Sequence, residues 1–379
     1  MRSAAIINNH LENLDEEQFI EGGTIALEGL AMRSGFIVED EKQLRKQVID
    51  DDEVLVQKHA FSCNYRDKAI LLTLATGLSK QAADKLHFSY FGSEFVATVL
   101  KVGSQVHGIK EGDRVIPDGT YQDWEQKGAM PGIPSNASSQ VVEVFHQSKL
   151  MTIPDSMSSN VAAGFTIGGQ TVSAMIRKAK LDIDSQVLVT SGTSSTSLFA
   201  VAFLKAIGID TFALTSSKIQ AAKLEQLGAK EVFVIDRSSP QRIADQFADL
   251  GRRVQFDAIL DPFADTWMLS CGSLLKHNGR YVTCGIYDQY SAVTGQPLSV
   301  PESKVFKSFY SHLILKNLEF IGNCLGTHED LAVALQLHET AEKLIDSVYS
   351  ESDLNGFLNR TYLDKSRFGK VIFSYDSPI

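Results

Sequence analysis

The sequence predicts an α/β protein with two domains, one rich in β-strands and one formed by a doubly wound parallel sheet. A chain of 379 residues is too long for one ordinary hydrophobic core. From Val54 to about residue 150, short β-branched and apolar segments dominate. After Pro154, apolar strands alternate with helical segments, which is typical of a parallel sheet covered by helices on both faces.

The first domain is predicted from extended segments separated by turn signals. EVLVQKHAF and EFVATVLKVGSQV have strand composition, and KEGDRVI reads as a turn followed by a strand. The first 45 or so residues have mixed polarity, and the acidic run IDDDEV at their end is expected to be a solvated turn.

The second domain is predicted from strands that are apolar throughout, as in a sheet buried on both faces. These strands are QVLVT, TFALT, EVFVI, FDAILD and GRYVTCGI. After about residue 318 we expect the strand LEFIGNCLG, a helix to about Val348 and a last strand, GKVIFSY.

Composition and charge argue against several classes of partner and indicate where the protein is located. The net charge of −10 argues against a general nucleic-acid binder, and the absence of a run of 18 apolar residues argues against a membrane span. The four cysteines form no CxxC pair and are expected to be reduced thiols. The N-terminus has no apolar signal core, so a cytoplasmic protein is expected.

The stretch VLVTSGTSSTSLFAVAFLKAIG, residues 187–208, reads as a strand, a tight turn and the first helix of a nucleotide-binding unit. Serines and threonines occupy the turn, where such a unit normally has glycines. Two interpretations follow: a turn that still binds a dinucleotide, or a degenerate site in a non-catalytic binding protein.

Seven motifs in order resemble the medium-chain dehydrogenase/reductase superfamily, and are most similar to its zinc-free quinone oxidoreductase and enoyl reductase branch. They are SCNYRD, GSEFVATVLKVGSQVHGIKEGDRV, the stretch 187–208, KLEQLGAKEVFVID, FDAILD, NGRYVTCG and LILKNLEFIGNCLGTHEDL. The resemblance implies a GroES-like catalytic domain with an N-terminal extension (1–165), a Rossmann NADP-binding domain (166–318) and a C-terminal completion of the catalytic domain (319–379). It also implies a homodimer.

The resemblance allows a test for zinc. The zinc-dependent members bind the metal through a Cys, the His of a GHE motif and a further Cys or acid. In this sequence Cys63 matches the first ligand, but the motif is GSE, so Ser93 stands in place of the His. No metal site is therefore expected, and Cys63 is expected to be a small buried hydrophobe.

Glu94 is expected to be a structurally paired carboxylate, the alternative being a pocket carboxylate. A metal-free reductase of a quinone or an α,β-unsaturated carbonyl is favoured over an alcohol or aldehyde dehydrogenase.

By likeness to the family turn TGASGGVG, the turn supplies most of the expected cofactor contacts. These are Gly192, Thr193, Ser194, Ser195, Thr196 and Ser197. A non-glycine residue forced to positive φ costs on the order of 1–2 kcal/mol, which reshapes a loop without unfolding a domain. Hydroxyls at a helix N-terminus can cap it or bind phosphate, so we expect cofactor binding to be retained.

The end of the next strand indicates which nicotinamide cofactor is used. An acid there would select NAD, but the sequence has Ser216, Ser217 and Lys218. Hydroxyls and a cation suit a 2′-phosphate, so NADPH is predicted. The alternative is a helix start with a serine cap.

The resemblance also assigns residues to the reaction. Asn64 would face the nicotinamide, and Tyr65 is the candidate proton or hydrogen-bond donor to the substrate, while Asp67 would hold the loop. Further cofactor contacts are expected at Thr171, Cys284, Gly285, Ile286, Asn323 and Cys324. Aromatic residues would line a site for a small hydrophobic or aromatic acceptor, namely Tyr121, Trp124, Tyr287, Tyr290, Phe309 and Tyr310.

Overall fold

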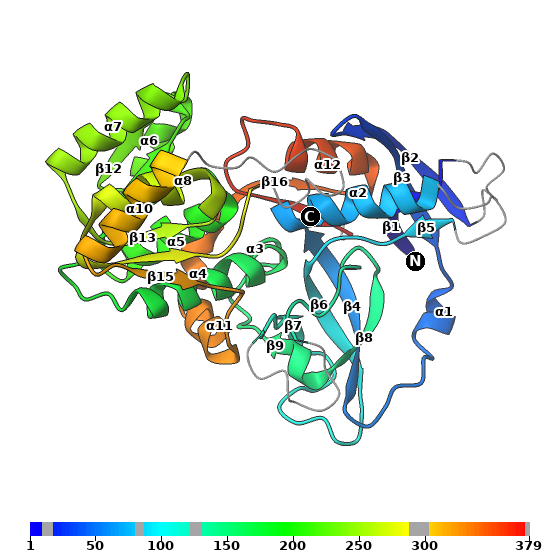
Figure 1. Cartoon of the computed structure of the whole chain (residues 1–379). Helices are drawn as coiled ribbons and strands as arrows, with labels where there is room; N and C mark the ends of the chain where they lie inside the picture. Colours follow the sequence, from blue (N-terminus) through cyan, green and yellow to red (C-terminus); the bar gives the residue numbers. More distant parts are fainter. Residues whose placement is uncertain (10–17, 80–86, 122–130, 288–302, 376–379) are drawn as a thin grey trace. The chain divides into compact units, whose positions relative to one another are not determined.

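The structure is a computed structural model that describes residues 1–9, 18–79, 87–121, 131–287 and 303–375 (Figure 1). The chain forms two compact units. Unit 1 combines Met1–Thr166 with Ile345–Ile379, and unit 2 is built from Ile167–Gln289 and Pro297–Leu344.

Unit 2 contains a six-stranded parallel sheet in the order β12-β11-β10-β13-β14-β15. Its strands are β10 (Gln186–Val189), β11 (Asp210–Thr215), β12 (Glu231–Val234), β13 (Phe256–Asp261), β14 (Leu275–Thr283) and β15 (Glu319–Gly322). This is the 3-2-1-4-5-6 order of a doubly wound nucleotide-binding fold. The predicted α/β fold with a Rossmann-type sheet is confirmed.

Helices flank this sheet (Figure 1). They are α4 (Thr166–Ala179), α5 (Ser195–Ala206), α6 (Lys218–Leu227), α7 (Pro240–Arg253), α8 (Ala264–Cys271), α10 (Ser303–Leu315) and α11 (His328–Leu335). One core joins Phe247 of α7 and Trp267 of α8 to Leu188, Phe212 and Ile259 of the sheet. Helix α5 packs against α6 and β11. The middle of α5 is apolar and buried all round, as expected of an interior helix.

Unit 1 is mainly β, as its sequence predicts. A seven-stranded sheet has the order β16-β17-β4-β6-β7-β9, with β8 paired to β4, and a four-stranded sheet has the order β2-β3-β1-β5. The strands of the larger sheet are β4 (Glu53–Ser62), β6 (Glu94–Val102), β7 (Arg114–Pro117), β8 (Val142–His146), β9 (Leu150–Thr152), β16 (Ile345–Tyr349) and β17 (Lys370–Ser374). The helices of this unit are α1 (Glu41–Leu44), α2 (Tyr65–Ser79), α3 (Ser159–Ala163) and α12 (Leu354–Tyr362).

The first 45 residues are part of this unit and not an appendage to it. They form β1 (Arg2–Ile7), β2 (Phe19–Leu27) and β3 (Leu30–Val38), and β5 (Phe88–Ser89) pairs with β1. Ile6, Leu27 and Phe36 lie in the same buried cluster as Phe61 and Phe373. The N-terminal extension, which the family resemblance does not explain, therefore contributes strands and core residues to the first domain.

The second domain boundary also differs from the prediction. The chain returns to unit 1 at Ile345 rather than at residue 319, because β15 extends the parallel sheet of unit 2 beside β14. The predicted helix to about Val348 ends earlier, since α11 stops at Leu335 and β16 begins at Ile345.

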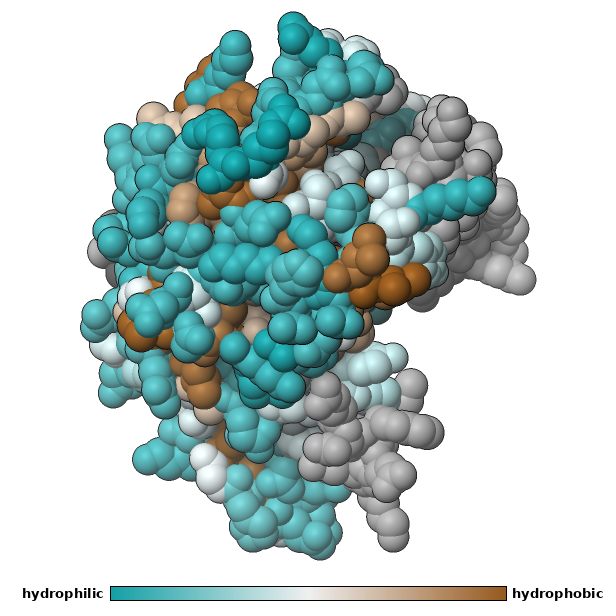
Figure 2. All heavy atoms as spheres, turned by 60° about the vertical axis from the view of Figure 1, so that its left-hand side comes forward, coloured by the Kyte–Doolittle hydropathy of each residue, from teal (hydrophilic) through white to brown (hydrophobic). Residues whose placement is uncertain are grey.

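The face of the molecule in Figure 2 is mostly hydrophilic, with apolar side chains in small groups. Exposed apolar residues include Ile219, Ile314 and Leu315. In the described parts of the chain, no helix has the length and apolar character needed to cross a bilayer.

Candidate functional site

The turn between β10 and α5 lies at the carboxyl end of the sheet's first strand, where ligands bind in open α/β folds. Part of the turn is held by its own hydroxyls. Thr190 Oγ1 donates to Asp261 Oδ1 (2.5 Å), and Ser197 Oγ donates to the Thr190 carbonyl (2.8 Å). Ser194 is the N-cap of α5, since its Oγ accepts from Ser197 N at 3.2 Å. These hydroxyls therefore replace glycines as the structural elements of the turn.

The one left-handed residue of the turn is Ser191, at φ +48°, and not the surviving glycine. Trp267 Nε1 donates to Ser191 Oγ at 2.9 Å, which stabilises this conformation. Gly192 meets a different requirement, because its N–H donates to the Leu214 carbonyl at 2.8 Å. A Cβ on Gly192 would lie 3.0 Å from Leu224 Cδ1 and 3.3 Å from that carbonyl oxygen. The displaced glycine thus permits a close approach to the end of β11.

The remaining residues of the turn offer free donors. Within the described residues, no acceptor binds the backbone N–H of Thr193, Ser195 or Thr196, and no partner engages their hydroxyls. All three residues are partly exposed. Free N–H groups and hydroxyls at a helix N-terminus are suited to a phosphate group. The donor set therefore fits a dinucleotide pyrophosphate.

The end of β11 presents the residues predicted to select the cofactor. Ser217 N donates to Thr215 Oγ1 at 3.0 Å, and α6 begins at Lys218. Ser217 occupies the N-cap position, but its side chain makes no capping bond. The alternative, a helix start with a serine at the cap, is thus confirmed for the position of Ser217, but the Ser217 hydroxyl makes no capping bond and stays available.

The other predicted cofactor contacts also lie in unit 2. Asn323 follows β15 and is buried, and its Nδ2 donates to the Leu325 carbonyl (2.7 Å) and the Thr171 carbonyl (3.4 Å). Cys284, Gly285 and Ile286 follow β14. Burial raises the pKa of the Cys284 thiol to about 12, with nearby acidic groups contributing, so this thiol is neutral at pH 7. Asn323 and Cys284–Ile286 thus lie at the carboxyl ends of β15 and β14, whereas Thr171 lies within α4.

A buried carboxylate links these strand ends. Asp261, at the end of β13, accepts from Thr190 Oγ1, from the Tyr281 hydroxyl and from Phe263 N (2.9 Å). Burial raises the pKa of Asp261, and hydrogen bonds from Thr190 and Tyr281 oppose that shift. Neither Asp261 nor Tyr281 was singled out from the sequence.

In unit 1, the predicted catalytic residue Asn64 belongs to a buried polar cluster. Its Nδ2 donates to Glu94 Oε1 at 2.6 Å, and its Oδ1 accepts from Lys370 Nζ at 2.6 Å. Lys370 also forms an ion pair with Glu94, to which Ser62 Oγ donates at 3.2 Å. Glu94 is fully buried and Lys370 is 1% exposed. Glu94 is thus a paired carboxylate, as expected.

Lys370 is the residue of this cluster that sequence reasoning missed. Its signal was a lysine that opens the apolar segment KVIFS, at a position where a strand is buried on both faces. A cation in such a place requires a buried acid.

Asp67 holds the loop before α2, as predicted. Its Oδ2 accepts from Asn64 N (2.7 Å) and Ser93 Oγ (2.6 Å), and Arg66 contacts its other oxygen. Tyr65 begins α2, is partly buried and packs against the hydrophobic cluster of unit 1.

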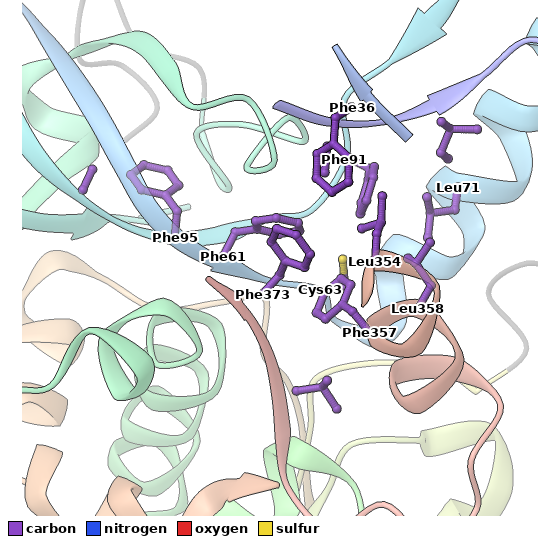
Figure 3. Packing of buried hydrophobic residues seen from close by; sticks show 14 of the residues in the cluster. Phe36, Phe61, Cys63, Leu71, Phe91, Phe95, Leu354, Phe357, Leu358 and Phe373 are labelled. Atoms are coloured by element: carbon purple, nitrogen blue, oxygen red, sulfur yellow. The ribbon is translucent and has the colours of Figure 1, made fainter. Parts of the chain in front are cut away.

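The residues at the family's zinc positions do not fit a metal. The sulfur of Cys63 lies among phenylalanine and leucine side chains, and burial raises its pKa well above the usual range (Figure 3). Ser93 donates its hydroxyl to Asp67. Across the described residues, no group of three His, Cys, Asp or Glu side chains is placed to hold a metal ion.

The aromatic residues proposed to line a substrate site have different environments. Tyr121, Tyr287 and Tyr310 are about half exposed. Phe309 is 5% exposed and packs edge-to-face on Phe320, so it belongs to the core of unit 2 and its predicted lining role is wrong. Trp124 and Tyr290 lie outside the described residues.

A pocket of about 550 Å³ lies in unit 1 beside α2. Its lining is mostly apolar and consists of Ile70, Leu74, Phe88, Ser89, Tyr90, Asn136 and Ala137.

Two family models match the chain in the same order as these structural units. Residues 50–155 match an alcohol dehydrogenase GroES-like domain, and residues 196–340 match a zinc-binding dehydrogenase domain. The chain belongs to the medium-chain dehydrogenase/reductase superfamily. The fold of this superfamily binds a nicotinamide cofactor.

Curated relatives resemble the chain at 23–29% identity. Acryloyl-coenzyme A reductase of Metallosphaera sedula is 23% identical, covering 75% of this chain and 82% of that protein. Quinone oxidoreductase of Pseudomonas aeruginosa is 29% identical, covering 57% of this chain and 61% of that protein. A phenolphthiocerol/phthiocerol polyketide synthase subunit of Mycobacterium tuberculosis is 25% identical over 63% of this chain, which spans only 10% of that subunit.

Solved medium-chain dehydrogenase/reductase structures share the fold. A thermostable alcohol dehydrogenase from Pyrobaculum aerophilum matches with a TM-score of 0.67 and 20% identity, covering 94% of this chain and 99% of the other. A 2-octenoyl-CoA carboxylase reductase in complex with NADP and 2-octenoyl-CoA matches with a TM-score of 0.72 and 17% identity, covering 100% of this chain and 89% of the other.

Proposed function

We propose that the protein is an NADPH-dependent, metal-independent reductase that transfers hydride to a quinone or an α,β-unsaturated carbonyl. The observation that carries the proposal is the turn after β10, where the N–H groups and hydroxyls of Thr193, Ser195 and Thr196 have no partner among the described residues. Free N–H groups occur at any helix N-terminus, and the partly exposed hydroxyls of these three residues add further donors for a phosphate group.

The cofactor's residues are proposed as follows. The outer donors of the turn bind the pyrophosphate, and Ser216, Ser217 and Lys218 bind the 2′-phosphate. Thr171, Asn323 and the backbone at Cys284–Ile286 bind the nicotinamide end. Bound NADPH supplies the hydride.

The proposal that the reductase acts without metal rests on the residues of unit 1 at the positions of the family's zinc ligands. Cys63 is part of an apolar cluster and Ser93 is hydrogen-bonded to Asp67, so neither provides a metal ligand. An enone or quinone is already polarised and needs no Lewis acid to accept hydride. The acryloyl-coenzyme A reductase and quinone oxidoreductase relatives carry out reductions of this class by their names.

The residues of unit 1 are proposed to position the acceptor and supply its proton. The Asn64 amide is fixed from both ends by Glu94 and Lys370, which sets its orientation. Tyr65 is proposed to donate a hydrogen bond, and then a proton, to the enolate oxygen that develops after hydride transfer.

Calorimetric titration with NADPH and NADH tests the cofactor. We expect NADPH to bind at least tenfold more tightly than NADH, and NADPH oxidation by an enoyl thioester or a quinone to proceed in metal-free buffer. Absence of binding by either nucleotide would favour the non-catalytic alternative. Activity that is lost on chelation and restored by zinc would favour the alcohol dehydrogenase alternative.

A further inference from the structure

Two cations at neighbouring strand ends of unit 2 form no salt bridge in the part of the chain that the structure describes, and Asp236 acts on Lys218 only by attraction at longer range. Lys218 follows β11 and Arg237 follows β12, and these parallel strands are hydrogen-bonded through Ile235 N and the Thr215 carbonyl (2.8 Å). Neither cation takes part in a hydrogen bond or an ion pair among the described residues.

Arg237 is unusual among the arginines of this unit in lacking a carboxylate partner within the described residues. The others pair as Arg177–Asp330, Arg242–Asp236, Arg252–Asp249, Arg253–Glu231 and Arg280–Glu319. Asp236 directly precedes Arg237, but its carboxylate accepts from Ser238 N (2.9 Å) and lies 3.6 Å from Arg242. A guanidinium left unpaired beside acids that pair elsewhere is available to an external anion.

Arg237 is nevertheless held in place. Its guanidinium carbon lies 5.2 Å from the centre of the Trp267 ring, within cation–π distance. Trp267 is 3% exposed and stacks on Phe247 at 5.8 Å, so the ring is a rigid platform. The arginine is therefore oriented before any ligand arrives.

The same indole holds the phosphate-binding turn. Its Nε1–H is bonded to Ser191 Oγ, at the left-handed residue of the turn. The N–H group of Trp267 thus contacts the turn, and the face of its ring contacts Arg237.

We propose that Arg237 is a second cation, together with Lys218, for the phosphate on the adenosine ribose, and that Trp267 is the positioning residue that aligns Arg237 with the turn. The proposal rests on the proposed NADPH dependence and names a residue that determines it. A planar guanidinium can donate two parallel hydrogen bonds to a phosphate, which a lysine cannot do, so Arg237 adds geometric selection to the charge of Lys218.

The test uses nucleotides that differ only at the ribose 2′ position. Binding of adenosine 2′,5′-bisphosphate and of 5′-AMP to the full-length protein is measured by calorimetry, for wild type and Arg237→Ala. We expect Arg237→Ala to weaken the bisphosphate about 10- to 100-fold, as for loss of a charge-assisted hydrogen bond, and to change 5′-AMP less than threefold. Arg237→Lys should recover part of the loss.

Arg252→Ala is the matched control, because Arg252 is an exposed arginine of the same unit that is paired with Asp249. It should leave both affinities unchanged. Trp267→Leu removes both the ring under Arg237 and the N–H group bonded to Ser191, so it should weaken the bisphosphate more than 5′-AMP, and the excess measures the lost alignment of Arg237. Melting curves of the variants show that the fold is retained.

The outcomes separate the two proposals. If wild type binds the bisphosphate and Arg237→Ala binds it equally well, the role of Arg237 is overturned while NADPH dependence stands. If wild type binds neither NADPH nor the bisphosphate, both proposals fail. If Trp267→Leu weakens both nucleotides by the same factor, or neither, the positioning role alone is overturned.

Discussion

Each unit contains a fully buried carboxylate at its candidate site, and the two are satisfied in different ways. Glu94 of unit 1 is paired with the buried cation Lys370 and accepts from Asn64 and Ser62. Asp261 of unit 2 accepts from the neutral donors Thr190, Tyr281 and Phe263 N.

The difference determines how each site responds to change. A buried ion pair is neutral as a whole, and removing one partner leaves an uncompensated charge in a low-dielectric interior. A carboxylate surrounded by neutral donors keeps its charge unpaired, so burial acts directly on its pKa. The stability of unit 1 should therefore be sensitive to the removal of either charge of the Glu94–Lys370 pair. The stability of unit 2 should depend on pH through Asp261.

The largest expected effect is that of Lys370→Met. It leaves Glu94 buried without its cation and should lower the free energy of unfolding by about 3–5 kcal/mol in urea denaturation. The double variant Lys370→Met/Glu94→Gln removes both charges and should recover at least half of the loss. Equal losses in both variants would show that the charge of Glu94 is not the cause.

Asp261→Asn should have a smaller effect, which depends on pH. The substitution should lower the free energy of unfolding by about 1–3 kcal/mol at pH 5, because one of the donors now bonded to the Asp261 carboxylate would then face the N–H group of an amide. The folded-state pKa of Asp261 is raised, so between about pH 4 and that pKa the folded protein holds a proton that the unfolded chain has released. Wild type therefore loses stability as pH rises through this window, whereas the amide of the Asp261→Asn variant does not titrate and has no such linkage.

The measurement is the difference in unfolding free energy between wild type and Asp261→Asn as a function of pH. The difference should shrink as pH rises. A difference that grows with pH would mean that the hydrogen bonds from Thr190 and Tyr281 outweigh desolvation.

Ser191→Ala tests how the turn is held. It keeps the left-handed residue but removes the acceptor of the Trp267 N–H, so we expect a loss of about 1 kcal/mol. Ser191→Gly loses the same bond but relieves the cost of positive φ, and should be close to neutral. Thermal melts of the two variants provide the comparison, and equal melting temperatures would show that the φ of Ser191 carries no strain.

The smallest effect on stability is expected for the outer residues of the turn. Ser195→Ala should change the free energy of unfolding by less than about 0.5 kcal/mol, because its hydroxyl has no partner in the described protein. NADPH affinity should still fall severalfold. Ser197→Ala is the matched inner variant, and should lower stability by about 1 kcal/mol through the lost bond to the Thr190 carbonyl.

The sequence predicted the sheet of unit 2 because its signals are local. Each strand is an apolar run, and each turn after a strand contains residues that favour the start of a helix. The alternation of strands and helices along the chain therefore predicts the fold. The position of β15 could not be predicted in this way. LEFIGNCLG has the composition of a strand in either domain, and only pairing with β14 assigns it to unit 2.

The candidate site was predictable where one contiguous motif carries it, as in Thr190–Ser197, and less so where distant residues meet. Lys370 pairs with Glu94 across 276 positions, and Trp267 bonds to Ser191 across 76. A lysine in an apolar strand and a tryptophan in a short helix indicate burial, but not the partner. Those partners depend on tertiary packing, which periodicity and composition do not contain.

The separation of Glu94 from Lys370 has a consequence for synthesis. At roughly 5–20 residues per second, Glu94 is synthesised on the order of 14–55 s before its cation Lys370. During that interval β4 lacks its neighbour β17, while the strands of unit 2 are all completed before β17 is reached. The half of the molecule that begins the chain is thus the half that finishes folding last, and its open sheet edge is the segment that most needs protection from aggregation on the ribosome.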